Sequence, residues 1–227
     1  MLKERRGNMY EFIDQTWNPI KGKCLHDCAY CYMKSIPQYS KPMLIEYELT
    51  KTLNYNTIFL GSSTDVFANN ISPEWIERIL NRGLEEYEKG NCSSFLLQSK
   101  NPKRFLEFIN HPIMKRCVLC TTIETNRFYP DFMRNAPKIE ERVEAMEEVA
   151  KQGIATMVTA EPLMQFDLET MLEHIRRCQP KVVNIGRNTR RNIKLPEPTK
   201  EEVQQLISGL KDFTKVHIKE NGKFWLA

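Results

Sequence analysis

Three cysteines near the start of the chain are spaced closely enough to share one metal centre. Cys24, Cys28 and Cys31 occupy positions 1, 5 and 8 of the stretch CLHDCAYC, and Tyr30 directly precedes the last thiol. Cysteine thiolates on such short loops hold iron–sulfur clusters, and three of them leave one iron of a four-iron cluster open to another ligand. The spacing therefore predicts a [4Fe–4S] cluster with one open iron.

A zinc site is the main alternative for these cysteines. Together with His26 they could form a tetrahedral site, because zinc accepts mixed cysteine and histidine ligands. His26 lies inside the first spacer, however, whereas usual zinc sites pair two ligands here with two further along the chain. On this alternative the protein would be a zinc-binding interaction module. A disulfide scaffold is less favoured, because the chain is long and has seven cysteines, an odd number.

The cysteine motif resembles the signature of the radical S-adenosylmethionine (SAM) superfamily. In that superfamily C-x3-C-x-aromatic-C holds the cluster, and the amino and carboxylate groups of SAM occupy the open iron. The resemblance implies reductive cleavage of SAM to a 5′-deoxyadenosyl radical, which abstracts a substrate hydrogen. It also implies a reductant such as flavodoxin or ferredoxin, and a cytoplasmic location. The seven cysteines favour a reducing cytoplasm as well.

Length, composition and charge are those of an ordinary globular protein. The chain has 227 residues, 41% of them hydrophobic, and a net charge of +4, which allows an anionic partner without requiring one. It has no run of about 18 apolar residues, so no membrane span is predicted. The charged N-terminus does not resemble a signal peptide. We expect residues 1–227 to form a single radical SAM domain, with a cluster loop over 16–35 and a strand-like tail over 215–227.

Apolar strand segments alternate with amphipathic helices along the chain. Strands are predicted at 9–13, 57–60, 95–98, 118–124, 156–160 and 182–185, and a last strand-like stretch at 216–219. Residues 16–19 are expected to break the first strand, while Ser72 and Pro73 are expected to begin a helix. This alternation argues for an α/β fold, in which helices cover a parallel sheet. Six units fit an open partial (β/α)6 barrel, although a doubly wound sheet has the same local pattern. The resemblance favours the partial barrel of the radical SAM type.

Polar side chains follow the predicted strands, at the end of the sheet where such folds bind ligands. They are Gly61, Ser62, Ser63, Thr64 and Asp65; Gln98, Ser99 and Lys100; Thr121, Thr122, Glu124 and Thr125; Glu161 and Pro162; and Asn184, Gly186 and Arg187. Turns are rich in such residues for other reasons, so a single position indicates little. The complete ring of polar ends is the stronger signal of a binding site.

Two later stretches, 98–102 with 121–124 and 135–142 leading into Gly153, look like the spore-photolyase-like branch of the superfamily. That resemblance implies roles in binding SAM: Gly61, Ser62 and Ser63 at its amino group, Lys100 at its carboxylate, Thr122 and Glu124 at the ribose, and Tyr30 by the adenine. Spore photolyase uses a thiol near the end of its second strand as hydrogen donor. This chain has serines there, so photoproduct repair is not predicted. Residues 16–19 also resemble a group of phage-associated radical SAM proteins.

Basic residues beyond the sixth strand give the best indication of the substrate. Arg187, Arg190 and Arg191 could hold a phosphate, because guanidinium groups bind phosphate oxygens bidentately. That favours a nucleobase, nucleotide or nucleic acid, and a solvated loop is the alternative. A peptide or small metabolite facing Asp65, Glu161 and Arg187 is the second possible substrate. Three aromatic side chains could stack on a base or pack as a lid: Phe67, Phe128 and Tyr129.

The four remaining cysteines are expected to have structural positions. Cys92, Cys117 and Cys178 precede or begin strands, which places them at the end of the barrel away from the site, and Cys120 lies within a strand. Buried free cysteine behaves as a small hydrophobic residue. No second cluster is therefore predicted.

Overall fold

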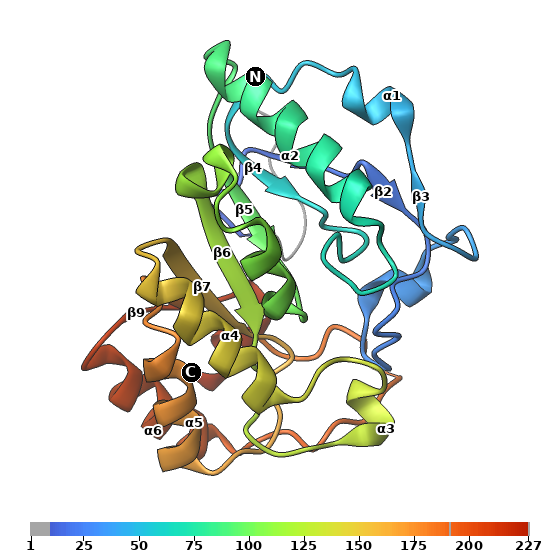
Figure 1. Ribbon diagram of the computed structural model, residues 1–227. Helices are drawn as coiled ribbons and strands as arrows, with labels where there is room; N and C mark the ends of the chain where they lie inside the picture. Colours follow the sequence, from blue (N-terminus) through green and yellow to red (C-terminus); the bar gives the residue numbers. More distant parts are fainter. Residues whose placement is uncertain (1–9, 191, 227) are drawn as a thin grey trace.

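The computed structural model describes residues 10–190 and 192–226. A parallel sheet forms its centre, and the seven described strands follow one another in chain order (Figure 1). They are β1 (Gln15–Trp17), β4 (Tyr55–Leu60), β5 (Cys92–Gln98), β6 (Cys117–Thr122), β7 (Ala155–Ala160), β8 (Val182–Ile185) and β9 (Lys215–Ile218). A short antiparallel pair, β2 (Ile20–Lys21) and β3 (Met43–Leu44), follows β1 in the chain.

Helices connect the strands at the places that the sequence indicates. The α-helices are α1 (Glu46–Leu49), α2 (Pro73–Glu88), α3 (Pro130–Met133), α4 (Ile139–Lys151), α5 (Leu168–Arg177) and α6 (Lys200–Lys211). Four segments are 3-10 helices: η1 (Tyr32–Ser35), η2 (Pro102–Phe108), η3 (Pro112–Arg116) and η4 (Glu220–Trp225). Gly90 and Gly153 follow α2 and α4 with φ angles of +74° and +73°, where glycine ends a helix without strain.

The strand order decides between the two predicted architectures. A doubly wound sheet reverses its strand order at one point, whereas here β1, β4, β5, β6, β7, β8 and β9 are neighbours in sequence throughout. Because parallel crossovers are right-handed, an order without reversal places every connecting helix on the same face of the sheet. The predicted partial barrel is therefore confirmed, and β9 adds one more parallel strand to its six strand–helix units.

Alternate residues of the strands build two separate apolar clusters. The larger lies between sheet and helices, for example between Ile58 and Leu119 on strands and Ile79 on α2. The smaller lies on the inner face and consists of Phe59, Leu96, Cys120 and Met157, covered by Tyr10 and Ile13. Apolar side chains thus fill the barrel interior beneath the strands' carboxyl ends, and these ends remain available for a site.

The first strand lies later in the chain than predicted. Of the predicted strand 9–13, Met9 lies outside the described residues, and residues 11 and 12 form a turn closed by a hydrogen bond from Ile13 N to Tyr10 O at 3.1 Å. Trp17, which was expected to break the strand, pairs instead with Leu60. Tyr10 and Ile13 are buried because they cover the barrel interior and not because they form a strand, whereas Phe12 is 44% exposed.

The four cysteines outside the motif are buried and free, as predicted: Cys92, Cys117, Cys120 and Cys178. Cys92 and Cys117 begin β5 and β6, and Cys178 follows α5. Within the described ranges, no helix combines the length and the apolar character needed to cross a membrane.

The start of α6 allows a test of helix capping. Thr199 Oγ1 accepts a hydrogen bond from Glu202 N at 3.2 Å, and the Glu202 carboxylate accepts one from Thr199 N at 2.7 Å. We expect Thr199→Ala to lower the free energy of unfolding by about 1 kcal/mol, measured by urea denaturation. Ser72 is the matched control, because it precedes α2 but its side chain makes no capping hydrogen bond. Ser72→Ala should change the free energy of unfolding by less than about 0.5 kcal/mol. Equal losses in the two variants would contradict a capping role for Thr199.

Candidate functional site

A cavity of about 870 Å³ lies at the carboxyl ends of the strands. Its lining contains the three cysteines and most of the polar residues predicted at the strand ends. These are Cys24, Cys28, Tyr30 and Cys31; Gly61, Ser62, Ser63, Thr64 and Asp65; Gln98, Ser99 and Lys100; Thr122; Glu161 and Pro162; and Arg187. The fold therefore brings side chains from the ends of separate strands to one site with the cysteine loop.

The three cysteines lie on an irregular loop between β2 and η1. Asp27 N and Cys31 N donate to Cys24 O and Cys28 O at 3.3 and 3.1 Å, and these turns hold the loop. Cys28 is buried, whereas Cys24 and Cys31 are half-buried. Burial raises the pKa of the Cys24 thiol to about 12. A metal would bind the deprotonated thiolates, so ligation would release the thiol protons.

The three thiols do not form a ready-made site for a single metal ion among the described residues. All three line one cavity and none forms a disulfide. A tetrahedral zinc ion with bonds of 2.3 Å requires ligand atoms only about 3.8 Å apart. No three His, Cys, Asp or Glu side chains among the described residues gather closely enough to hold one ion. The described thiols therefore form no closed zinc site in this structure, and metal analysis distinguishes a cluster from zinc.

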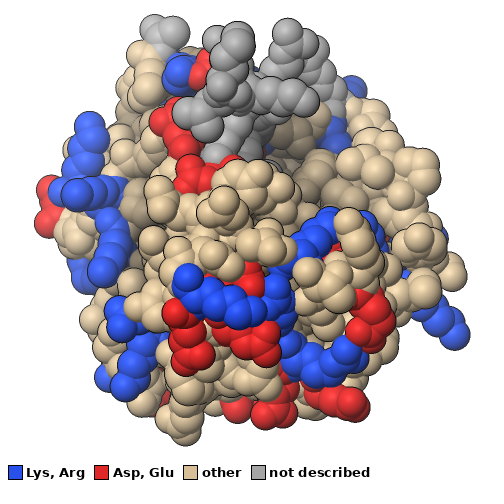
Figure 2. All heavy atoms as spheres, turned by 90° about the horizontal axis from the view of Figure 1, so that it is seen from above, with Lys and Arg blue, Asp and Glu red and all other residues tan. Residues whose placement is uncertain are grey.

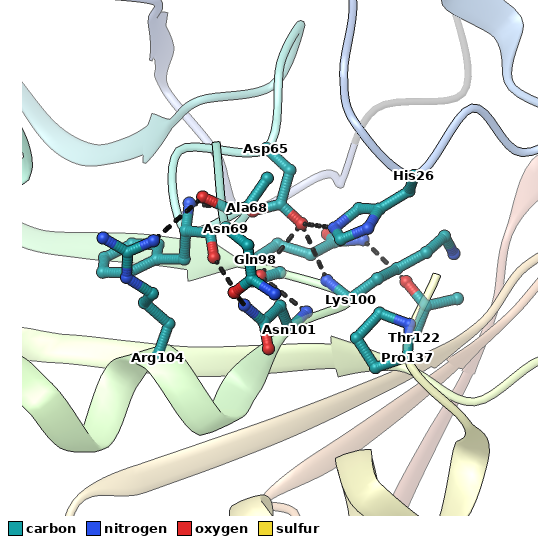
Figure 3. A network of polar contacts seen from close by, with 12 residues as sticks. His26, Asp65, Ala68, Asn69, Gln98, Lys100, Asn101, Arg104, Thr122 and Pro137 are labelled. Carbon is teal, nitrogen blue, oxygen red and sulfur yellow. Dashed lines mark hydrogen bonds and ion pairs between the residues drawn. The ribbon is translucent and has the colours of Figure 1, made fainter. Parts of the chain in front are cut away.

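A buried pair, His26 and Asp65, anchors the cysteine loop (Figure 3). His26 Nε2 lies 2.8 Å from Asp65 Oδ2, which also accepts hydrogen bonds from Ser99 Oγ and Lys100 N, both at 2.9 Å. Phe67 N donates to the other carboxylate oxygen at 2.9 Å. Burial by itself would raise the pKa of Asp65, but the His26 ring and these donors lower it. Asp65 was predicted to face substrate; it lines the cavity, but its carboxylate holds the loop.

A second anchor centres on Glu124, whose side chain has no exposed surface. Its carboxylate accepts hydrogen bonds from Lys100 Nζ at 2.5 Å, from Arg142 Nη1 at 2.8 Å and from the Tyr30 hydroxyl. Arg142 is also fully buried and donates to Thr122 O and Pro137 O, both at 2.8 Å. Burial would raise the pKa of Glu124, but the Arg142 and Lys100 cations lower it to about 2. One ionised carboxylate thus connects the sheet, α4 and the cysteine loop.

This arrangement differs from the predicted SAM contacts in one respect. Glu124 lies behind the cavity wall and faces Arg142, Lys100 and Tyr30, whereas the resemblance implied that it faces the ribose. Its neighbours Lys100 and Tyr30 line the cavity, and so does Thr122, whose hydroxyl is 3.4 Å from Gln98 Nε2. The roles of these three residues toward SAM stay predictions.

The loop after β4 is shaped by a glycine and held by Asn18. Gly61 has a φ angle of +76°, and a Cβ there would lie 2.6 Å from Val66 Cγ2, so a side chain would be strained and crowded. Asn18 Oδ1 accepts hydrogen bonds from Ser63 N at 2.9 Å and from the hydroxyls of Ser62 and Ser63 at 3.2 and 3.0 Å. The two serines therefore have fixed positions beside the cysteines.

Two of the three arginines predicted to hold phosphate already have partners. Arg187 lines the cavity but pairs with Glu197 at 2.6 Å. Arg190 donates to Ala29 O of the cysteine loop at 3.1 Å, and Arg191 lies outside the described residues. Ion pairing and loop packing, which the sequence does not reveal, engage these guanidinium groups.

The remaining predicted substrate residues also have defined surroundings. Glu161 lines the cavity and accepts hydrogen bonds from Lys219 Nζ at 2.6 Å and from Asn221 Nδ2 at 2.9 Å. Phe67 is buried with its ring centroid 4.7 Å from that of Phe105, so it belongs to the core and cannot stack on a base. Phe128, by contrast, is 56% exposed, and Tyr129 is half-buried.

Several important residues were missed in the sequence. Only Arg142 carried a usable signal: it interrupts the apolar face of α4, three residues after Ile139 and four before Met146. A buried arginine at such a position needs an anion. Asn18 and Lys219 act through contacts with residues far along the chain, and the sequence offered no pattern for them. His26 was considered only as a zinc ligand, and its contact with Asp65 was not predicted.

The fold is shared with solved radical SAM enzymes. No family model and no curated protein matches the chain. A cysteine-to-serine variant of spore photoproduct lyase matches with a TM-score of 0.66 at 9% identity, covering 95% of this chain and 80% of that one. A cysteine-to-alanine variant of the lyase with dinucleoside spore photoproduct matches with 0.66 at 11% identity, covering 88% and 75%.

A third solved structure, SuiB of Streptococcus suis bound to S-adenosylmethionine, matches with a TM-score of 0.59 at 9% identity, covering 90% of this chain and 49% of that one. The predicted resemblance to the radical SAM superfamily is thus confirmed for the fold. The likeness to phage-associated proteins stays a prediction.

The Glu124 anchor predicts a specific loss of stability. Glu124→Gln leaves two buried cations without their anion and should lower the free energy of unfolding of the apoprotein by about 3 to 5 kcal/mol at pH 7. Because the folded pKa is depressed, this contribution is present above the unfolded value of about 4.3 and is lost as pH falls toward about 2. Denaturation at several pH values should therefore show wild type and variant converging in acid. Exposed Glu148→Gln is the control, and equal effects of both substitutions would refute the anchor.

Proposed function

We propose that this protein is a radical SAM enzyme that holds a [4Fe–4S] cluster on Cys24, Cys28 and Cys31 and acts on a nucleobase, nucleotide or nucleic acid. The cavity carries this proposal: thiols of the required spacing share it with Gly61 and Lys100, at the carboxyl ends of a partial barrel. When bound, the cluster and SAM would supply the one-electron chemistry that removes a hydrogen atom from substrate.

The chain's own task is to hold and orient SAM and substrate. Lys100, whose side chain is 17% exposed, is available at the cavity wall for a carboxylate, and Glu124 behind it fixes the position of its amine. The ordered loop of Gly61, Ser62 and Ser63 would meet the amino group of SAM. A flavodoxin-like or ferredoxin-like reductant and a reducing cytoplasm complete the proposal.

The substrate class rests on the fold neighbours and on the distribution of charge. One neighbour was solved with a dinucleoside spore photoproduct, which supports a nucleotide-like substrate. Photoproduct repair itself is not proposed, because Ser62 and Ser63 stand where a thiol is needed. At the end of the molecule seen in Figure 2, basic side chains lie among acidic ones. The atoms described at that end form no broad basic surface.

Metal analysis and electron paramagnetic resonance test the cofactor. Anaerobically reconstituted protein should hold about four irons and four sulfides per chain, and the signal of the reduced cluster should change shape when SAM is added. Cys24→Ala, Cys28→Ala and Cys31→Ala should each lose most of the iron. Cys92→Ala, which removes a buried thiol at the start of β5, should keep it. Zinc-loaded protein without a cluster signal would reject the proposal.

Oligonucleotide binding tests the substrate class. Replacing Arg190 and Arg191 together by alanine should weaken binding of a short single-stranded oligonucleotide about tenfold and lower its salt dependence, measured by fluorescence anisotropy. Because Arg190 also contacts Ala29 O of the cysteine loop, the variant is compared only if its cluster signal is unchanged. The control replaces Lys115 and Arg116, two adjacent exposed basic residues just before β6. If the wild type binds no oligonucleotide or nucleotide, the alternative of a peptide or small metabolite is favoured.

A further inference from the structure

One side of the cavity is lined by the Lys219–Glu161 ion pair and by Arg187, whose partner Glu197 is not part of the cavity lining. Lys219, directly after β9, pairs with Glu161, directly after β7, at 2.6 Å, and Arg187 pairs with Glu197 at the same distance. Lys219, Glu161 and Arg187 all line the cavity. The Lys219–Glu161 pair itself combines one cation with one anion, so it is poorly suited to a phosphate. It presents instead an ammonium donor beside a carboxylate acceptor.

The Lys219–Glu161 pair is held rigidly from several sides. Lys219 Nζ lies 4.5 Å from the centroid of the Tyr10 ring, and Lys219 N donates to Ile185 O at 2.9 Å. Asn221 Nδ2 bridges Glu161 Oε1 at 2.9 Å and Arg187 O at 2.7 Å. Side chains fixed in this way discriminate between ligands more sharply than mobile ones.

A glycine permits this close arrangement. A Cβ on Gly186 would lie 2.9 Å from Glu161 Cδ and 2.9 Å from Asn221 Oδ1. Any other residue would therefore push Glu161 or Asn221 from its position. Gly186→Ala offers a way to disturb the geometry of the pair without changing a charge.

We propose that Lys219 and Glu161 determine substrate specificity by binding neighbouring carbonyl and N–H groups on the edge of a nucleobase. An ammonium has three donors, only one of which is needed for Glu161. The side chains of Lys219 and Glu161 are 7% and 17% exposed, and both border the cavity, so a bound ring can reach them. Adjacent acceptor and donor groups are what the edge of a base presents. This proposal rests on the proposed function, because it names the part of the substrate that the same cavity binds.

Nucleoside binding tests the pair without turnover. Reconstituted protein with SAM and without reductant would be dialysed against uridine, guanosine, adenosine, cytidine, N3-methyluridine and ribose 5-phosphate. We expect at least one nucleoside to bind, and Lys219→Met and Glu161→Gln each to weaken it tenfold or more, since a buried polar site rejects a mismatched partner. If uridine is that ligand, N3-methyluridine should bind at least tenfold more weakly. Gly186→Ala should also weaken binding, whereas ribose 5-phosphate binding should not depend on Lys219.

Lys215→Met is the matched control, because Lys215 is exposed on the same strand and does not line the cavity. No nucleoside binding by wild type, tighter binding of ribose 5-phosphate than of any nucleoside, or unchanged affinity in Lys219→Met would each overturn the proposal. The SAM-dependent resonance signal of each variant distinguishes a failure of the proposed function from a failure of the proposed role of Lys219 and Glu161. A variant that keeps this signal retains the cluster and the SAM site, so its nucleoside affinity tests the Lys219–Glu161 pair alone. Loss of the signal in wild type would reject the proposed function itself.

Discussion

The structure of the site depends on one ionised carboxylate that has no contact with water. Glu124 stands just beyond β6 and binds Arg142 of α4, Lys100 beyond β5 and Tyr30 of the cysteine loop. In such surroundings a carboxylate charge is tolerated because Arg142 and Lys100 supply cations beside it and Tyr30 supplies a hydrogen bond. Removing the carboxylate would leave the buried Arg142 cation without its anion. The loop that carries the cysteines is therefore fixed by the hydrogen bond from Tyr30 to the buried Glu124 carboxylate and not by secondary structure of its own.

A second polar anchor holds the same loop from another side. Asp65 combines the His26 ring with backbone and side-chain donors, and its position is set by the strand β4 that precedes it. The loop itself contributes only short turns. Ligands on an irregular loop keep their geometry when residues behind them hold the loop in place. The two anchors, from β4 and β6, meet that requirement.

The interior of the barrel explains why the site lies at one end only. Along the inner face, Phe59, Leu96, Cys120 and Met157 are apolar and are covered by Tyr10 and Ile13. One step further along β5 and β6 the same face carries Gln98 and Thr122, which line the cavity. Because strand side chains alternate with a period of two, each strand can serve the core at its start and the site at its end. Tyr10 links the two regions, since its hydroxyl donates to Gln98 at 2.8 Å.

The sequence by itself determined the local features of this protein. Alternating strands and helices, the helix ends near Pro73 and Gly153, the cysteine spacing and the polar strand ends all follow from neighbouring residues, whose pattern is readable directly. Tertiary structure decided the rest. It set the barrel rather than a doubly wound sheet, and moved the first strand to Gln15–Trp17, because both depend on which strands pair across the sheet. It also committed Asp65, Glu124 and Arg187 to partners within the protein, because an ion pair forms only where folding brings opposite charges from distant segments together.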